Sequence, residues 1–206
     1  MSIFQMRTLP HGIERFQRFL DGKFVCVGWP GLGDLSSISK DDLRDKISSV
    51  YSKSGHSLGH TLGQVNAFVN TMQAGDTVII ANKGWAHIGT VGDYEYAAEY
   101  DNDEDGMCHR RPVQWLGRAP IADLNPSIQT LLRNRNAVAQ YPQTFEESNL
   151  SQVLGYLSPV PTHEKSKFDN LFDAALGILE TELTSEDPDR RLRAATELVR
   201  LKRGGG

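Results

Sequence analysis

The hydrophobic runs of this sequence are short, and turn-forming residues end each of them. The stretch FVCVGWPGLGDLS begins as an apolar run that reaches Trp29 and then meets Pro30 and Gly31. Such a run is typical of a short buried strand that ends in a turn. None of the runs approaches the about 20 apolar residues that a membrane-spanning helix needs. We therefore expect a core assembled from several short elements and no membrane segment.

Amphipathic helical patterns separate these runs. One begins after Ser39, a favourable N-cap, and carries Asp41 and Asp42 in its first turn, where the helix dipole favours acidic residues. A second pattern ends at Gly75 and leads into the buried strand TVIIAN, which is followed by the strand-like stretches WAHIGTVGDYEY and VQWL. Short strands with two helices after the second strand predict an α+β fold, a small mixed β-barrel with flanking helices.

The character of the sequence changes at about residue 144, where the strand patterns stop. We therefore expect a barrel domain at 1–143 and a helical C-terminal extension at 144–206. The extension is interpreted as a link to an effector or as an assembly element. Its apolar residues recur at helical spacing in two stripes, which are Phe168, Leu171, Phe172, Ala175, Leu176 and Leu179, and then Leu192, Ala195, Leu198, Val199 and Leu201.

The charge and cysteine content narrow the class of protein. A formal net charge of -4 argues against a generic nucleic-acid coat protein, whose affinity comes from neutralising phosphates, but it leaves room for a local basic rim. Cys26 and Cys108 lie far apart in the sequence, and Cys26 falls inside an apolar run, so we expect Cys26 to be a buried thiol and the protein to have no disulfide framework. These features indicate a cytoplasmic protein.

No catalytic or metal-binding motif is complete. GLGDLS lacks the lysine of a phosphate-binding loop. DNDEDG matches the start of a calcium-binding EF-hand loop, but Pro112 stands where the bidentate glutamate is required. An exposed acidic turn is the simpler interpretation of that stretch. We expect no enzymatic activity, no metal ion and no cofactor.

Four stretches, in their order along the chain, resemble the PUA-like superfamily and within it the EVE and YTH domains. GKFVCVGWPGLGDLS resembles the strand that ends at a pocket tryptophan, and LGQVNAFVNTMQAGDTVIIAN resembles the helix and strand that follow. AHIGTVGDYEY and HRRPVQWL resemble the next strand and the strand that closes the barrel. The likeness covers residues 1–141 and is greatest to the EVE-like N-terminal module of restriction-type (Mrr-like) proteins, in which a nuclease domain follows.

The resemblance implies a barrel that binds a modified nucleobase flipped out of its strand. Trp29 matches the tryptophan that stacks on this base, although plain core packing is the alternative role for a tryptophan. YTH domains place further tryptophans before the closing strand, and this sequence has none there. A tyrosine is therefore expected as the second wall of the pocket, with Tyr94, Tyr96 and Tyr100 as the candidates.

Other candidate contacts follow from residue type and position. Arg7 and Thr8 match, by the resemblance, the place of polar base contacts in YTH domains. Asp34 either accepts a hydrogen bond from a base edge or caps its own loop. Trp85, at a predicted hairpin, contacts nucleic acid or packs across strands, whereas Trp115 is assigned to the core. The candidates for phosphate contacts, with a solvated face as the alternative, are Lys83, Arg110, Arg111, Arg133 and Arg135.

The resulting hypothesis is a reader of a modified base in DNA, within a prokaryotic restriction or anti-phage defence system. Its C-terminal helices would couple the reader to an effector such as a nuclease. Two alternatives stay open. One is a module that binds RNA or senses a free nucleotide, and the other is a scaffold that assembles through its helices.

Overall fold

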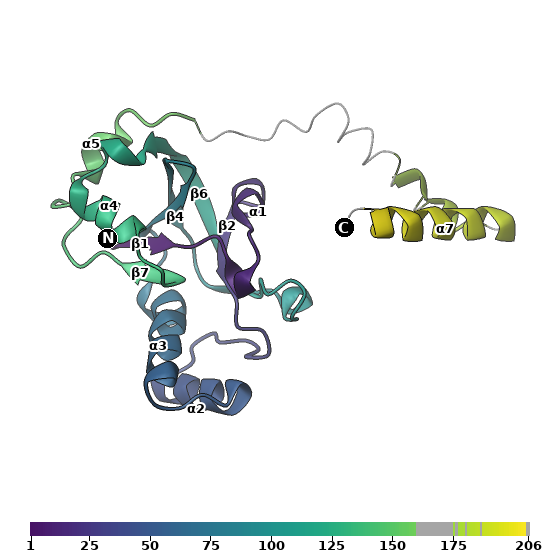
Figure 1. The fold of residues 1–206 in the computed structure, drawn as a ribbon, viewed down its shortest axis with the longest axis horizontal. Helices are drawn as coiled ribbons and strands as arrows, with labels where there is room; N and C mark the ends of the chain where they lie inside the picture. Colours follow the sequence, from purple (N-terminus) through teal and green to yellow (C-terminus); the bar gives the residue numbers. More distant parts are fainter. Residues whose placement is uncertain (160–174, 176, 180, 186, 205–206) are drawn as a thin grey trace. The chain divides into compact units, whose positions relative to one another are not determined.

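The computed structural model describes residues 1–159, 175, 177–179, 181–185 and 187–204 (Figure 1). Contacts divide the chain into two compact units, Met1–Pro161 and Thr162–Gly206. Of the first predicted apolar stripe, four residues lie outside the described part, namely Phe168, Leu171, Phe172 and Leu176. The side chain of Leu201, in the second stripe, lies outside it too.

The first unit is built on a seven-stranded sheet, and the predicted α+β class is confirmed. The strand order is β2-β6-β4-β3-β1-β7, and β5 pairs with β6. Only the pairing of β1 with β3 is parallel among these described strands. The strands are β1 (Ile3–Met6), β2 (Phe24–Val27), β3 (Thr77–Asn82), β4 (Trp85–Val91), β5 (Glu95–Tyr96), β6 (His109–Pro120) and β7 (Val138–Gln140).

The long strand β6 makes the sheet curl. Its first residues pair with β2 and β5, and the residues from Val113 onward pair with β4. The register between β4 and β6 shifts between Ile88 and Gly89, which is a bulge that increases the local twist. β6 thereby joins the part of the sheet that contains β2 and β5 to the part formed by β4, β3, β1 and β7.

The two helices predicted after the second strand are α2 (Lys40–Tyr51) and α3 (Gly55–Asn66). Ser39 caps α2 as predicted, because its Oγ accepts a hydrogen bond of 3.1 Å from the Asp42 amide. Figure 1 shows α2 and α3 on one side of the sheet, and α4 (Pro126–Leu132) and α5 (Leu150–Leu154) on the other. The remaining short helices of this unit are α1 (Phe16–Asp21), η1 (Pro10–Gly12), η3 (Ala98–Tyr100) and η4 (Ile121–Asp123).

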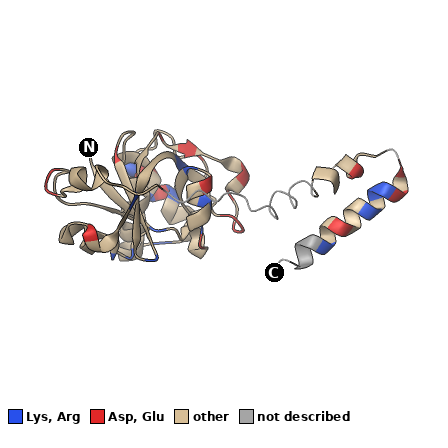
Figure 2. Cartoon of the chain, turned by 90° about the horizontal axis from the view of Figure 1, so that it is seen from above, with Lys and Arg blue, Asp and Glu red and all other residues tan. Residues whose placement is uncertain are grey.

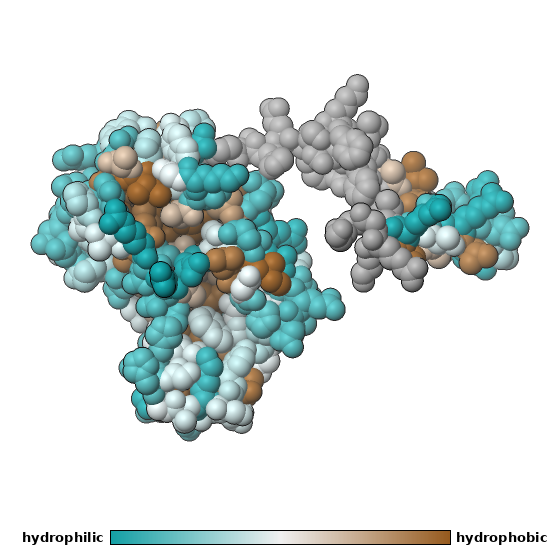
Figure 3. Space-filling view, in the orientation of Figure 1, coloured by the Kyte–Doolittle hydropathy of each residue, from teal (hydrophilic) through white to brown (hydrophobic). Residues whose placement is uncertain are grey.

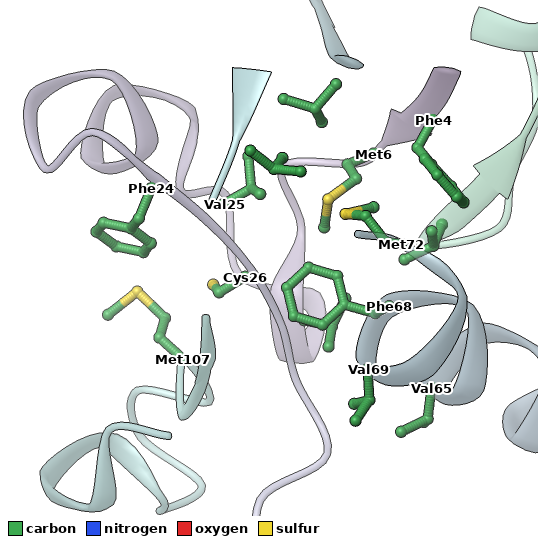
Figure 4. Close-up of a cluster of buried hydrophobic side chains, with 14 of the residues drawn as sticks. Phe4, Met6, Phe24, Val25, Cys26, Val65, Phe68, Val69, Met72 and Met107 are labelled. Carbon is green, nitrogen blue, oxygen red and sulfur yellow. The ribbon is translucent and has the colours of Figure 1, made fainter. Parts of the chain in front are cut away.

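A hydrophobic cluster is packed against each face of the sheet. In the larger one, Phe68 of the π-helical turn η2 (Ala67–Thr71) and Met72, which directly follows this turn, lie beside Met6 of β1 (Figure 4). In the smaller one, Leu150 and Val153 of α5 are buried. Residues after the predicted domain boundary at 143 therefore belong to the first unit, because α5 buries its apolar face on the sheet.

The second unit contains α7 (Pro188–Gly204). Ala194 is buried, but Leu192 and Val199 of the predicted stripe are exposed. Basic and acidic residues both lie along this helix (Figure 2), and hydrophobic patches interrupt its hydrophilic surface (Figure 3). Within the described ranges, no helix is both long enough and apolar enough to cross a membrane.

Candidate functional site

Trp29 stands directly after β2 in an unusual backbone conformation. Its φ is 71°, in the left-handed region that bulky residues avoid. Holding a residue there costs about 1–3 kcal/mol, and such strain concentrates at functional sites. The side chain is half-buried and packs on the larger cluster. Core packing therefore accounts for one part of the ring, and the remainder of the side chain is accessible.

A cavity of about 300 Å³ lies beside Trp29. This volume is at the lower end of the range for small-molecule sites in proteins. The segments that form it come from distant parts of the sequence: η1, the end of β2, the end of α2 and the residue before β7. The lining residues are Leu9, Pro10, His11, Gly28, Trp29, Tyr51, Lys53 and Ala137.

Close backbone packing brings η1 against the end of β2. A Cβ atom at Gly28 would lie 2.7 Å from the amide nitrogen of His11, so only glycine fits at this position. His11 itself has a φ of 51°. Two lining residues other than glycine, His11 and Trp29, are thus held in the left-handed region on adjacent segments.

Tyr51 is the second aromatic residue of the cavity. Its hydroxyl donates a hydrogen bond to the carbonyl oxygen of Pro30 and so ties the end of α2 to the loop that carries Trp29. Burial, aided by the negative charge of Asp101, raises the pKa of Tyr51, which therefore stays protonated. Sequence reasoning missed this residue, although it continues the buried face of α2 four residues after Ile47.

The three tyrosines predicted as the second wall do not line the cavity. Tyr94 accepts a hydrogen bond of 3.3 Å from the Leu35 amide and bonds to Nδ1 of His109 at 2.8 Å. Tyr96 donates to the Asp101 carboxylate at 2.6 Å. The ring of Tyr100 lies under the Arg110 guanidinium, 3.9 Å from ring centroid to Cζ. Tyr94 directly, and Tyr96 through Asp101, thus support the loop after Trp29.

Asp101 is the centre of this supporting cluster. Its carboxylate accepts hydrogen bonds of 2.6 Å from both the Gly31 amide and the Tyr96 hydroxyl. Burial alone would raise the pKa of Asp101, but hydrogen bonds from Tyr96, Gly31 and the Cys108 thiol lower it. The carboxylate thereby fixes the Pro30–Gly31 turn next to Trp29.

Both cysteines are buried and free, as expected for Cys26. Burial and the neighbouring Asp101 carboxylate raise the pKa of Cys108 to about 12. Burial also raises the pKa of Cys26. Both thiols therefore remain protonated and behave as core groups. His109, beside them, is fully buried, and burial lowers its pKa.

Two of the predicted phosphate contacts are engaged inside the protein. Arg111 is only 3% exposed, and its guanidinium donates to the carbonyl oxygens of Phe68, Val69, Met72 and Gly92. It is not available to a phosphate, contrary to the prediction, because a buried cation needs these acceptors. Arg110 is half-buried between the rings of Phe24 and Tyr100.

The other predicted cations are exposed, and one of them is near the cavity. Lys83 lies in the β3–β4 hairpin and Arg133 ends α4. Arg135 lies two residues before Ala137, and its carbonyl oxygen accepts a hydrogen bond of 3.3 Å from Arg7 Nη1. The amide of Arg7 donates to the Ala137 carbonyl at 3.0 Å.

The Arg7 guanidinium thus bonds to the backbone of Arg135, and each of these residues lies two positions from a cavity-lining residue, Leu9 or Ala137. Thr8, the second residue carried over with Arg7, is 7% exposed.

The remaining predicted contacts lie outside the cavity lining. Asp34 accepts from the amide and hydroxyl of Ser36, and these bonds lower its pKa, so it caps its own loop. Trp85 packs across strands against the Arg118 guanidinium, 4.3 Å from the ring centroid. Trp115 packs on the larger cluster, as predicted, and its Nε1 donates to the Phe19 carbonyl.

The acidic turn of DNDEDG is organised by its own side chains. Asn102 Oδ1 accepts from the amides of Glu104 and Asp105 at 3.0 and 2.8 Å. In the part of the chain that the structure describes, no group of three or more His, Cys, Asp or Glu side chains is arranged to hold a metal ion.

Fold and site together define an α+β domain with a small aromatic cavity at the end of the edge strand β2. Residues 8–139 match the model of a family described as a domain of unknown function, DUF8426, and the chain belongs to this family. The matched region contains every residue that lines the cavity. No curated protein matches the chain.

Proposed function

We propose that this protein is a PUA-like, EVE-type reader that takes a flipped, modified nucleobase of DNA into the cavity beside Trp29. The carrying observation is Trp29 itself, held in a strained left-handed conformation at a cavity of about 300 Å³ that Tyr51 also lines. An extruded base needs flat apolar walls for its faces and a few polar groups for its edge. A methyl or hydroxymethyl group on the base would add contacts in so small a cavity.

The order of the elements supports the same proposal. Two helices follow the second strand, a parallel pair joins β1 to β3, and the long β6 returns beside β2. These features agree with the order of the four stretches that resemble EVE and YTH domains. A PUA-like barrel is the proposed assignment for the curled sheet, with a prokaryotic restriction or defence system as its setting and a nuclease or other effector as its partner.

Basic side chains lie near the cavity, as binding to a nucleic-acid strand requires. Lys53 lines the cavity, and Arg7 and Arg135 each lie two positions from a lining residue, Leu9 and Ala137. In the proposed complex, the two arginines hold the phosphates that flank the flipped nucleotide, because phosphate contacts fix the position of a protein on a strand.

A free nucleotide is the second candidate ligand. The contacts that Arg110 and Arg111 make within the protein favour it. Both side chains are engaged inside the protein, so fewer cations remain for a phosphate backbone. The two candidates differ in salt dependence, because binding to a strand weakens steeply with salt and binding to one nucleotide far less.

A binding titration tests the proposal. Short single- and double-stranded DNA would carry cytosine, 5-methylcytosine, 5-hydroxymethylcytosine, adenine or N6-methyladenine, with matched RNA, at two salt concentrations. We expect a preference for one modified base, lost in Trp29→Ala and kept in the control Trp85→Ala, which removes a half-buried tryptophan outside the cavity lining. Equal binding by Trp29→Ala and the wild type would refute the proposal.

A further inference from the structure

We propose that Lys53 anchors an oxygen acceptor of the bound nucleotide, either a phosphate oxygen or a carbonyl oxygen of the base. The inference rests on the proposed function and assigns a specific contact within that site. It is carried by the position of Lys53 in the cavity wall, by its unused hydrogen-bond donors, and by the chemistry of the other lining residues.

The chain turns Lys53 into the cavity wall. Ser52 ends α2 with a φ of 50°, which reverses the direction of the backbone. Ser48 Oγ donates a hydrogen bond of 3.0 Å to the Lys53 carbonyl oxygen, and Lys53 Nζ donates one of 2.8 Å to Oγ1 of the buried Thr61. The half-buried ammonium is therefore held in one place between α2 and α3.

The Lys53 ammonium has N–H donors that no described residue of the protein accepts. A lysine ammonium has three N–H donors, and Thr61 accepts one of them. Among the residues that the structure describes, no carboxylate lies within 4 Å of Lys53. The Tyr51 ring, 5.8 Å from Nζ, provides only a weak cation–π contact. A half-buried cation in this state favours an incoming oxygen acceptor.

The other lining residues leave this role to Lys53. No carboxylate is among the eight lining residues, and Lys53 carries the only permanent charge among them. The Tyr51 hydroxyl already donates to the Pro30 carbonyl. His11 Nε2 lies 3.7 Å from Asp103 Oδ1, so a carboxylate already faces that ring nitrogen. A ligand between the aromatic residues would thus direct its oxygen acceptor toward Nζ.

A structural role makes a different prediction. Lys53 lies just beyond the C-terminus of α2, where a cation stabilises the helix dipole by a few tenths to about 1 kcal/mol. If this were its whole contribution, replacing it would lower stability slightly and leave the affinity for ligand unchanged.

The test compares Lys53→Met, Lys53→Arg, Trp29→Ala and the control Lys83→Met, an exposed lysine in the β3–β4 hairpin. The ligand is the preferred DNA of the titration above, and affinity is measured from low to moderate salt. We expect Lys53→Met to weaken binding about tenfold or more, Lys53→Arg to recover much of it, and Lys83→Met to change little. Thermal unfolding checks that each variant folds, and Lys53→Gln replaces Lys53→Met if the latter does not.

The salt dependence separates the two sources of oxygen. For a phosphate, Lys53→Met weakens all sequences alike and reduces the slope of log K against log salt by about 1. For a base carbonyl, the slope stays the same and the preference among bases changes. Both results support the inference.

Wild-type affinity in Lys53→Met, with binding lost in Trp29→Ala, overturns the inference and leaves the proposed function standing. Wild-type affinity in Trp29→Ala overturns both, whatever Lys53→Met does, because the ligand then does not occupy this cavity.

Discussion

Polar and aromatic side chains lie on both sides of the loop after Trp29, but they differ in whether their hydrogen-bonding groups have partners within the protein. On the supporting side, Tyr94, Tyr96 and Asp101 each have a hydrogen-bond partner within the protein. On the cavity side, Lys53 keeps unused donors, and Trp29 keeps a half-buried ring on a strained backbone. Satisfied polar groups rigidify a structure, whereas unsatisfied groups around a cavity are free for a ligand. The contrast indicates that the first cluster positions the site and the second binds.

The largest effect is expected at the centre of the supporting cluster. Asp101→Ala removes the acceptor of the Gly31 amide, the Tyr96 hydroxyl and the Cys108 thiol. We expect the free energy of unfolding to fall by about 2–3 kcal/mol, since the Tyr96 hydroxyl and the Cys108 thiol are each left without an acceptor at about 1 kcal/mol or more, and the exposed Gly31 amide adds less. Urea unfolding measures it. The control is Asp103→Ala, an exposed carboxylate in the same turn, and equal losses in the two variants would contradict the assigned role.

The next effect concerns the second wall. Tyr51→Ala should weaken binding of the preferred DNA by about 1–3 kcal/mol, or roughly five- to 150-fold, if its ring stacks on the base. Tyr94→Ala serves as the comparison, with affinity corrected for the folded fraction from its unfolding curve. A loss confined to the Tyr94 variant would reverse the assignment of the two sides.

The difference in acid stability between the wild type and Asp101→Asn isolates the contribution of Asp101. Because folding lowers its pKa, the carboxylate contributes stability above its unfolded pKa of about 3.9, and this stability is lost as the pH falls through the folded pKa. Between about pH 5 and pH 2, the stability of the wild type should therefore fall more than that of Asp101→Asn. Parallel curves for the two proteins would show that Asp101 carries no such linkage.

The smallest effect is expected from the removal of a single hydroxyl group. Tyr94→Phe removes the bonds to the Leu35 amide and His109 and should lower stability by about 1 kcal/mol, with no change in affinity for ligand. Unfolding and titration on the same sample measure both quantities. A weakened affinity at unchanged stability would place the Tyr94 hydroxyl in the binding site.

Local patterns allowed much of the fold to be predicted from the sequence. The cap at Ser39, the strand before Trp29 and the two helices after it depend on neighbouring residues, so the sequence reveals them. The site depends on distant contacts. Tyr51 and Lys53 enter the cavity because the end of α2 packs on the Pro30 loop, which periodicity does not report.

The burial of Arg111 also depends on contacts with residues that are distant in the sequence. An arginine in a strand is usually assigned to a solvated face, but here η2, the following Met72 and Gly92 present four carbonyl oxygens to its guanidinium. Neither stretch is near Arg111 in sequence. The packing of α5 on the sheet is likewise a tertiary contact that a change in residue pattern at 144 does not disclose.

The central claim is that a base leaves its stack and enters the cavity beside Trp29. The most direct measurement places 2-aminopurine next to the preferred modified base and follows its fluorescence on binding, because extruding a base unstacks its neighbour. We predict an increase with the wild type and with Trp85→Ala, and a much smaller one with Trp29→Ala at saturating protein. Binding by the wild type without any increase in fluorescence would contradict the account.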